Sequence, residues 1–308
     1  GAGADIQRLN FPAIVGASAP WINSSKIKNQ GIDFELTWQD KIGRDFRYYI
    51  KPNFTFARNK IEFTNEINWG DNTWRQATGK PMYSNFTYVF DHFVADQAEA
   101  DALNASGIQG SFGKLIPGDV VYKDMNNDKV IDDKDRAAQG YPRSPEIMFG
   151  IPVGITYKGF DFSVLFQGAA NSSVLLNGAA VYDFPNFDND KLGKVKPLHM
   201  NRWTPETAAT AKYPALHLGT HNNNKNSRNS LFLYDASYMR LKNLEIGYSL
   251  PHSIIKIANL QQVRFYIQGQ NLFTWDKLDD VDVDPETSSN GTWYPIQKTF
   301  NFGVNITF

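Results

Sequence analysis

The chain has 308 residues, a formal net charge of −1 and no cysteine. The balanced charge gives no sign of a nucleic-acid or anionic-lipid partner, and the absence of cysteine excludes a thiol nucleophile, a Cys-ligated metal and a disulfide framework. Mean hydropathy is −0.43, and no run approaches the roughly 20 apolar residues of a spanning helix, so any crossing of a membrane would use strands.

Taken in chain order, the sequence is dominated by blocks in which apolar and polar residues alternate. In the last block, for example, Phe302, Val304 and Ile306 alternate with small or polar residues. Successive side chains of a strand point to opposite faces, so each block predicts a strand with one apolar and one polar face. The predicted strands are seven, at about 31–40, 46–61, 147–157, 160–175, 238–250, 263–275 and 294–308.

A soluble sandwich also alternates, but two features favour a membrane barrel. The polar faces carry full charges, and the apolar faces are rich in aromatic residues near the strand ends, as in barrel girdles. The connections also alternate in length: short at 41–45, 158–159 and 251–262, long at 62–146, 176–237 and 276–293. Outer-membrane barrels have short periplasmic turns and long external loops. The predicted fold class is therefore all-β, a transmembrane antiparallel β-barrel.

Seven strands are not expected to form a whole barrel, because single-chain bacterial barrels have an even strand number and need closure. Residues 1–4 also lack the features of a signal peptide. We therefore expect the chain to be part of a longer protein.

Several segments resemble one known family. They are the closing segment 293–308, the segments 238–251 and 268–275, the loop motif from Pro117 to Arg136, and the motif at 201–206. In this order they are similar to the C-terminal part of SusC/RagA-like TonB-dependent outer-membrane transporters, and they span most of the chain.

The resemblance implies a 22-stranded barrel of which this chain supplies about seven C-terminal strands, as a multi-pass protein surrounded by outer-membrane lipid. It also implies active import of oligosaccharides or peptides as the barrel subunit of a SusCD-type complex. The implied partners are a SusD-like surface lipoprotein and TonB–ExbB–ExbD, the latter through an N-terminal part with a plug that is not in this chain.

No catalytic constellation is visible. The five histidines are scattered, and no HExxH, GxSxG or P-loop motif occurs, so we predict no enzyme and no organic cofactor. Two alternatives to import stay open. One is an outer-membrane surface receptor or adhesin without transport, and the other is a soluble calcium-dependent sugar-binding β-protein.

The long loops contain candidate substrate and structural residues. Trp69, Trp74, Trp203 and Trp293 offer flat faces that could stack on sugar rings, but anchoring of the loops or a place at the membrane rim is the more common role of such residues in barrels. Residues 96–104 predict a short helix capped by Asp96. The acidic stretch 276–286 is interpreted as a solvated outer loop.

The segment 124–135 predicts a calcium site. Its candidate ligands stand at positions 1, 3, 5, 7, 9 and 12 of an EF-hand-like loop: Asp124, Asn126, Asp128, the Val130 carbonyl, Asp132 and Asp135. Two residues depart from that pattern, since Lys129 takes the usual glycine position and Asp135 is shorter than the usual glutamate. The alternative is an acidic turn held by side-chain hydrogen bonds alone. The expected role of Ca²⁺ is to stiffen the first long loop.

Overall fold

The computed structural model describes residues 2–8, 21–109, 112–184, 195–218, 223–287, 290–292 and 294–308. Its strands are β1 Ala2–Arg8, β2 Trp21–Glu35, β3 Trp38–Ile42, β4 Phe46–Ile50, β5 Asn53–Thr64, β6 Asn85–Tyr88, β7 Phe90–Phe93, β8 Val120–Tyr122, β9 Arg136–Gln139, β10 Ile147–Tyr157, β11 Phe160–Ala170, β12 Ser173–Leu175, β13 Leu233–Asp235, β14 Tyr238–Ser249, β15 Gln262–Trp275 and β16 Thr299–Thr307. The α-helices are α1 Gln97–Ser106 and α2 His252–Ile255. Short 3₁₀ turns lie at Thr73–Arg75, Asp133–Asp135, Gly178–Ala180, Pro197–Asn201, Ser230–Phe232, Lys256–Ala258 and Asp279–Val281. Among these residues, none of the helices has the length and hydrophobicity required to span a membrane.

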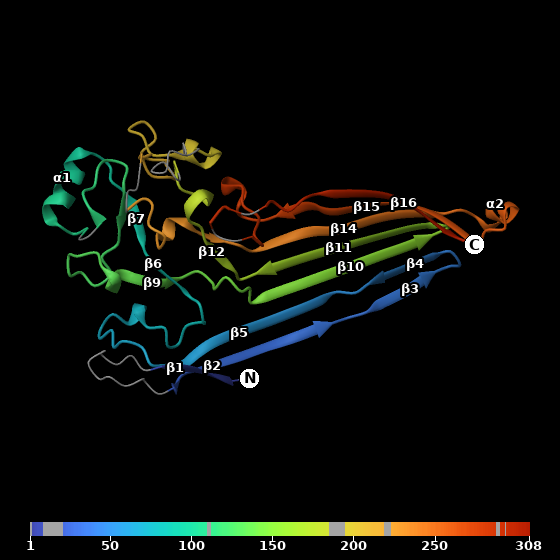
Figure 1. Cartoon of the computed structure of the whole chain (residues 1–308), viewed down its shortest axis with the longest axis horizontal. Coiled ribbons are helices and arrows are strands. Elements are labelled where there is room, and N and C mark those ends of the chain that lie inside the picture. Colours follow the sequence, from blue (N-terminus) through green and yellow to red (C-terminus); the bar gives the residue numbers. More distant parts are fainter. Residues whose placement is uncertain are drawn as a thin grey trace.

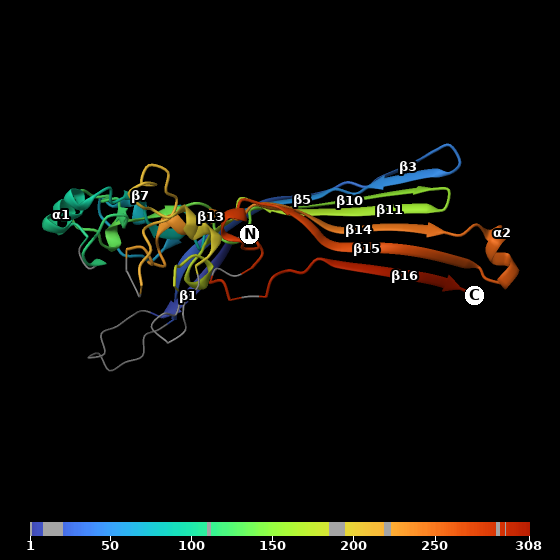
Figure 2. The same cartoon turned by 90° about the horizontal axis from the view of Figure 1, so that it is seen from above.

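The long strands form one antiparallel sheet in the order β1-β2-β5-β10-β11-β14-β15-β16, so neighbours in sequence are neighbours in space. β3 and β4 continue β2 and β5 beyond short interruptions. Pro52, which has no N–H to donate, lies at one of them. The sheet is a single curved layer, and the long loops gather at one end of it (Figures 1 and 2). The short turns and α2 lie at the opposite end, which we call the turn end.

The observed strands differ from the predicted ones in their bounds. The first begins at Trp21 rather than at 31, and the blocks at 31–40 and 46–61 are each interrupted. The block at 160–175 leaves the sheet after Ala170, and the last strand begins at Thr299 rather than at 294. β1 adds a strand to the seven predicted, pairing with β2. Its sequence carries no run of large alternating residues, so the pattern gave no signal for it.

The register aligns apolar side chains in rows across the sheet. One row near the turn end joins Tyr157, Phe160, Tyr248, Phe265 and Val304. Residues directly opposite each other in antiparallel strands share a face, so these rows form one continuous apolar face. The β10–β11 turn fixes this register, since Lys158 and Gly159 both have positive φ, as a two-residue type I′ hairpin requires.

The buried apolar core lies in the loops rather than on the sheet. The clusters surround Phe232 and Leu176, Tyr122 and Ile131, and Val94 and Leu115. Three two-stranded sheets (β6–β9, β7–β8 and β12–β13) brace this loop region. The helix predicted at 96–104 is confirmed as α1, and the Asp96 side chain accepts a hydrogen bond of 2.9 Å from the Glu99 N–H.

Candidate functional site

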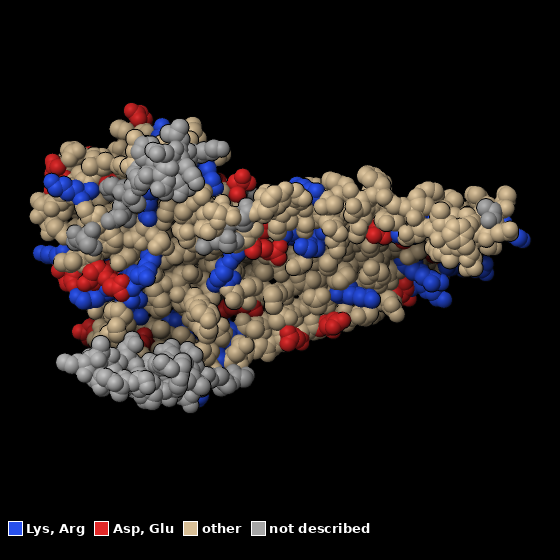
Figure 3. Space-filling view, viewed as in Figure 1, with Lys and Arg blue, Asp and Glu red and all other residues tan. Residues whose placement is uncertain are grey.

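The polar face of the sheet is the first part of the candidate site. Charged side chains of both signs lie along the strands on the face seen in Figure 3. By register this face is opposite the apolar rows. It carries Asp33, Glu35, Asn53, Thr55, Asp161, Gln167, Glu245, Arg264, Gln268 and Asn301. A wall of this kind is suited to a water-filled passage.

Near the turn end, one arginine organises the charges of this wall. Arg264 of β15 donates to Asp161 of β11, with its Nε 3.0 Å from Oδ1, and its Nη2 lies 2.5 Å from Oε1 of Glu245. The side chain is 16% exposed, so its charge is partly withdrawn from water and compensated by two carboxylates. Three neighbouring strands are thus joined by charge-assisted hydrogen bonds.

Glycines make room for large side chains that lie along this wall. A Cβ atom added at Gly154 would fall 2.2 Å from the Tyr49 ring, and one at Gly247 would fall 2.4 Å from Arg264 Nη2. At Gly303 the corresponding distance to the Tyr266 ring is 2.3 Å. Each large side chain therefore lies flat over a glycine of the neighbouring strand.

Where the polar wall meets the loops there is a hollow of about 730 Å³. Asn53, Thr55 and Gln167 line it from the strands. Arg143 and Glu286 line it from the loops. Its lining combines hydrogen-bond donors and acceptors with apolar surface, as small-molecule and oligomer subsites do.

A buried arginine ties the last long loop to this hollow. Arg240 of β14 is 1% exposed and lies 2.5 Å from both Asp284 and Glu286. The interpretation of 276–286 as a solvated loop is therefore correct only in part: Asp280 and Asp282 are exposed, whereas Asp284 and Glu286 pair with Arg240. Leu278, Val281 and Val283 of the same stretch are buried in the largest apolar cluster, so hydrophobic burial and the Arg240 ion pairs hold the loop down.

Buried charged groups also join the first long loop to the second. Asp119, which is fully buried, lies 2.6 Å from His217 Nε2 and accepts from the Asn224 amide at 3.0 Å. Within the second loop, Asp183 lies 3.4 Å from Lys225 Nζ. Sequence reasoning missed the pair of Asp119 with His217, because partners about 100 residues apart along the chain give no local signal.

The three described tryptophans that were predicted to bind sugar have different surroundings. Trp203 is 8% exposed, and a Cβ atom at Gly118 would fall 2.5 Å from its ring. This placement corrects the sugar-stacking prediction for Trp203, whose ring is used in packing. Trp69 stacks on Arg75 at 4.2 Å, and Trp74 donates to the Lys134 carbonyl at 2.7 Å. Trp293 lies outside the described residues.

The segment predicted to bind calcium folds as a tight loop. Asp124 Oδ2 accepts from the N–H of Lys129, which has a φ of 66° at the glycine position. Asp135 is fully buried and accepts from the N–H groups of Met125 and Asp132 at 2.8 and 2.7 Å. Burial raises the pKa of Asp135, and the carboxylates of Asp124 and Asp132 raise it further. Asp124 Oδ1 is buried without a hydrogen-bond partner.

Two of the remaining predicted ligands, Asp128 and Asp132, face a lysine of the same loop. Lys134 Nζ lies 3.4 Å from Asp128 and 3.5 Å from Asp132, and Asn126 donates to Asp128 at 2.8 Å. The Asn126 and Lys134 contacts lower the pKa of Asp128. Among the residues that the structure describes, no group of three histidine, aspartate or glutamate side chains is arranged to hold a metal ion.

The geometry defines a class of protein: an antiparallel sheet with one apolar and one polar face, and with folded loops at one end. Comparison with known proteins agrees with it. The chain is 27% identical over 97% of its length to TonB-dependent receptor P3 of Formosa agariphila. It is 25% identical over 93% to TonB-dependent receptor SusC of Bacteroides thetaiotaomicron. It spans about 30% of the length of these relatives. No family model matches.

Solved structures show the same fold. The RagAB peptide importer in its open-open state superimposes with a TM-score of 0.70 at 21% identity, covering 99% of this chain and 31% of that one. The RagAB peptide transporter gives a TM-score of 0.66 at 20% identity, covering 98% of this chain and 32% of that one. In sequence and fold the chain thus resembles part of the SusC/RagA-like TonB-dependent receptors, in agreement with the predicted resemblance. The all-β antiparallel fold class is confirmed. The relatives are named as receptors and not as enzymes, in line with the prediction from the sequence.

Proposed function

We propose that this chain forms part of the wall and external loops of an outer-membrane importer for oligosaccharides or peptides, working as the barrel subunit of a SusCD-type complex. The observation that carries the proposal is the apolar face of the sheet. Its large side chains are exposed along the whole wall, among them Ile32 at 69%, Ile246 at 50% and Phe302 at 76%.

Exposure of such a face to water would be unfavourable, and soluble proteins rarely expose contiguous apolar patches beyond a few hundred Å². The loops of the same chain bury their own apolar residues in ordinary cores. Apolar side chains are thus exposed on the sheet but buried in the loop region. This contrast supports a lipid environment for the sheet and an aqueous one for the loops.

The polar face and the hollow at the loop base support a path for a polar solute. The hollow is lined by amide, hydroxyl and charged groups of both signs, a set that suits the hydroxyls of sugars and the backbone of peptides equally. One of the solved structures that share this fold is a peptide importer, and the proposed substrates therefore include peptides as well as oligosaccharides.

The test uses the full-length receptor in its own cell. We expect it to fractionate with outer membranes, to need detergent for extraction, and to support energy-dependent uptake of labelled oligosaccharides or peptides. Solubility without detergent would favour the soluble sugar-binding alternative. Membrane residence with ligand binding, but with no uptake in cells that possess TonB, would favour the receptor or adhesin alternative.

The proposed partners follow from the same assignment. A SusD-like surface lipoprotein would cover the loops, and TonB–ExbB–ExbD would act on the part of the receptor beyond this chain. Purification of the tagged full-length receptor in mild detergent tests the first partner: a lipoprotein should co-purify in stoichiometric amount, and its absence would count against a SusCD-type complex.

We also propose that the 124–135 loop takes up Ca²⁺ as a stabilising ion. The support is the under-compensated pair formed by Asp135, buried with a raised pKa, and Asp124, whose Oδ1 has no partner. A raised carboxyl pKa means that the charged form opposes folding near neutral pH, and a cation bound beside it would offset that cost. For Ca²⁺ to gather Asp128 and Asp132 as well, Lys134 would have to withdraw.

Lys134 makes the calcium proposal testable. Ca²⁺ should raise the thermal stability of the full-length receptor and protect the first long loop from protease, whereas Mg²⁺ should not. Asp124→Asn should abolish the effect, and Lys134→Gln should strengthen it by removing the competing cation. If chelator changes neither melting nor proteolysis, and Lys134→Gln only destabilises the loop, then Lys134 itself is the cation of this loop.

A further inference from the structure

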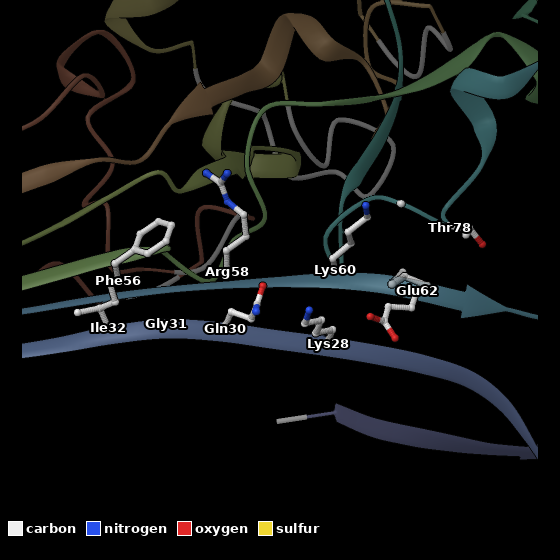
Figure 4. Close-up of a pocket in the computed structure, with 11 residues that line it drawn as sticks. Lys28, Gln30, Gly31, Ile32, Phe56, Arg58, Lys60, Glu62 and Thr78 are labelled. Atoms are coloured by element: carbon white, nitrogen blue, oxygen red, sulfur yellow. The ribbon is translucent and has the colours of Figure 1, made fainter.

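The apolar face ends abruptly on β2 and β5, on the side toward the long loops. Ile32 and Phe56 are paired directly across the two strands and form the last apolar row there. The next two pairs on the same face are Gln30 with Arg58 and Lys28 with Lys60. Figure 4 shows these side chains along the two strands, beside a hollow of about 870 Å³ that they line together with Thr78.

Two lysines placed opposite each other are unfavourable in a strand pair, because like charges at this spacing repel. The neighbouring cations have counterions: Lys26 lies 2.8 Å from Glu62, and Arg58 lies 2.6 Å from Glu146. Within the described residues, Lys28 and Lys60 form no ion pair. Four cations thus face two carboxylates. Glu62 also attracts Lys28 and Lys60 electrostatically, but the group of six keeps an excess of positive charge.

The position of Lys28 and Lys60 relative to the apolar face indicates which negative group could compensate their charge. Strands rise about 3.3 Å per residue, and barrel strands are tilted by about 40°. Lys60 is four residues beyond Phe56, so its backbone stands about 10 Å above the edge of the apolar face. Headgroups occupy the zone just outside the hydrocarbon, and lysine stems can lie along apolar surface while the ammonium reaches that zone.

We infer that Lys28 and Lys60 bind the phosphate of an outer-leaflet lipid headgroup, with its acyl chains lying on Ile32 and Phe56. The inference rests on the proposed function, since it requires the apolar face to contact a bilayer. Charge complementarity and continuity with the apolar face favour a lipid over a free anion, because a soluble ion would gain nothing from the apolar floor of the hollow.

The experiment compares the full-length receptor with its Lys28→Gln/Lys60→Gln variant, using native mass spectrometry with added phosphatidylglycerol, phosphatidylcholine or inorganic phosphate. Two lysines at an anionic surface correspond to about a thirty-fold change in affinity. We expect that loss for phosphatidylglycerol and little change for phosphatidylcholine. Lys51→Gln is the matched control, because Lys51 lies over the Tyr49 ring on the polar face. Lys28→Arg/Lys60→Arg should retain binding.

The outcomes separate this inference from the proposed function. The lipid site is overturned if the double variant binds phosphatidylglycerol as well as wild type does, or if Lys51→Gln loses as much binding. In either case the importer proposal still stands, provided that the receptor is found in the outer membrane. An equal loss of inorganic phosphate binding would replace the lipid by a free anion. If the wild-type receptor does not reside in the membrane, both proposals fall.

Discussion

Replacing Val164 by arginine places a charge near the middle of the apolar face. Val164 of β11 is paired with Val153 of β10 and with Leu244 of β14. β10 has 11 residues, which is about 33 Å of strand and, with a tilt of about 40°, about 25 Å of height. Val153 is four residues from Tyr157, so this row lies about 10 Å above the turn-end edge, close to the midplane.

A charge at that depth costs about 2–4 kcal/mol in an outer-membrane barrel, which corresponds to about a 30- to 700-fold loss in the ratio of folded to unfolded protein. The matched control is Ser163→Arg, one residue away on the polar wall beside Glu245. We expect it to be nearly neutral.

The assay is urea-induced unfolding of the full-length receptor reconstituted in lipid vesicles, with outer-membrane yield as a second measurement. Val164→Arg should lower both quantities, and Ser163→Arg should leave both close to wild type. If Ser163→Arg costs as much as Val164→Arg, or more, the assignment of the two faces is reversed and the proposed membrane placement fails.

Three further substitutions test the contacts within the wall and the loops. Arg240→Met should cost about 2–3 kcal/mol, reduced by the partial exposure of its carboxylate partners, and should make residues 276–293 sensitive to protease; unchanged protection would show that apolar burial alone holds the loop. Burial lowers the pKa of His199. The second long loop should therefore lose stability as pH falls below about 6.5, because the histidine of the unfolded chain gains a proton at a higher pH than that of the folded chain. Hydrogen exchange should show this loss in wild type and not in His199→Gln, and equal pH dependence in both would contradict it. Gly247→Ala should displace Arg264 at a cost of about 1–2 kcal/mol, and this cost should vanish in an Arg264→Ala background, so additive costs would refute the contact.

The strands were predictable because their information is local. Alternation over consecutive residues is enough to reveal β10, β11 and β14, each of which has a half-exposed face. Strand β1 was not predictable from the sequence, since residues 2–8 contain only one large apolar residue, Ile6. Its place in the sheet comes from pairing with β2, and pairing is a property of the folded chain.

The charged contacts of the candidate site were not predictable for a related reason. Arg240 and Asp284 are 44 residues apart, and nothing in either neighbourhood marks them as partners. The overall charge of −1 likewise conceals Lys28 and Lys60, because a sum over the chain says nothing about which residues the register places side by side. Composition excluded classes of function, whereas topology was needed to place charges.

The glycines of the polar wall have a consequence for the proposed import function. Where Tyr49 and Tyr266 lie flat over Gly154 and Gly303, an aromatic ring projects from the wall by its thickness instead of its length. In the proposed importer the passage would therefore keep its width and present a smooth surface to a moving solute. A methyl group at either glycine would lift the ring toward the axis and turn it into an obstacle, so permeability could be lost at these positions while the receptor remains correctly inserted and stable.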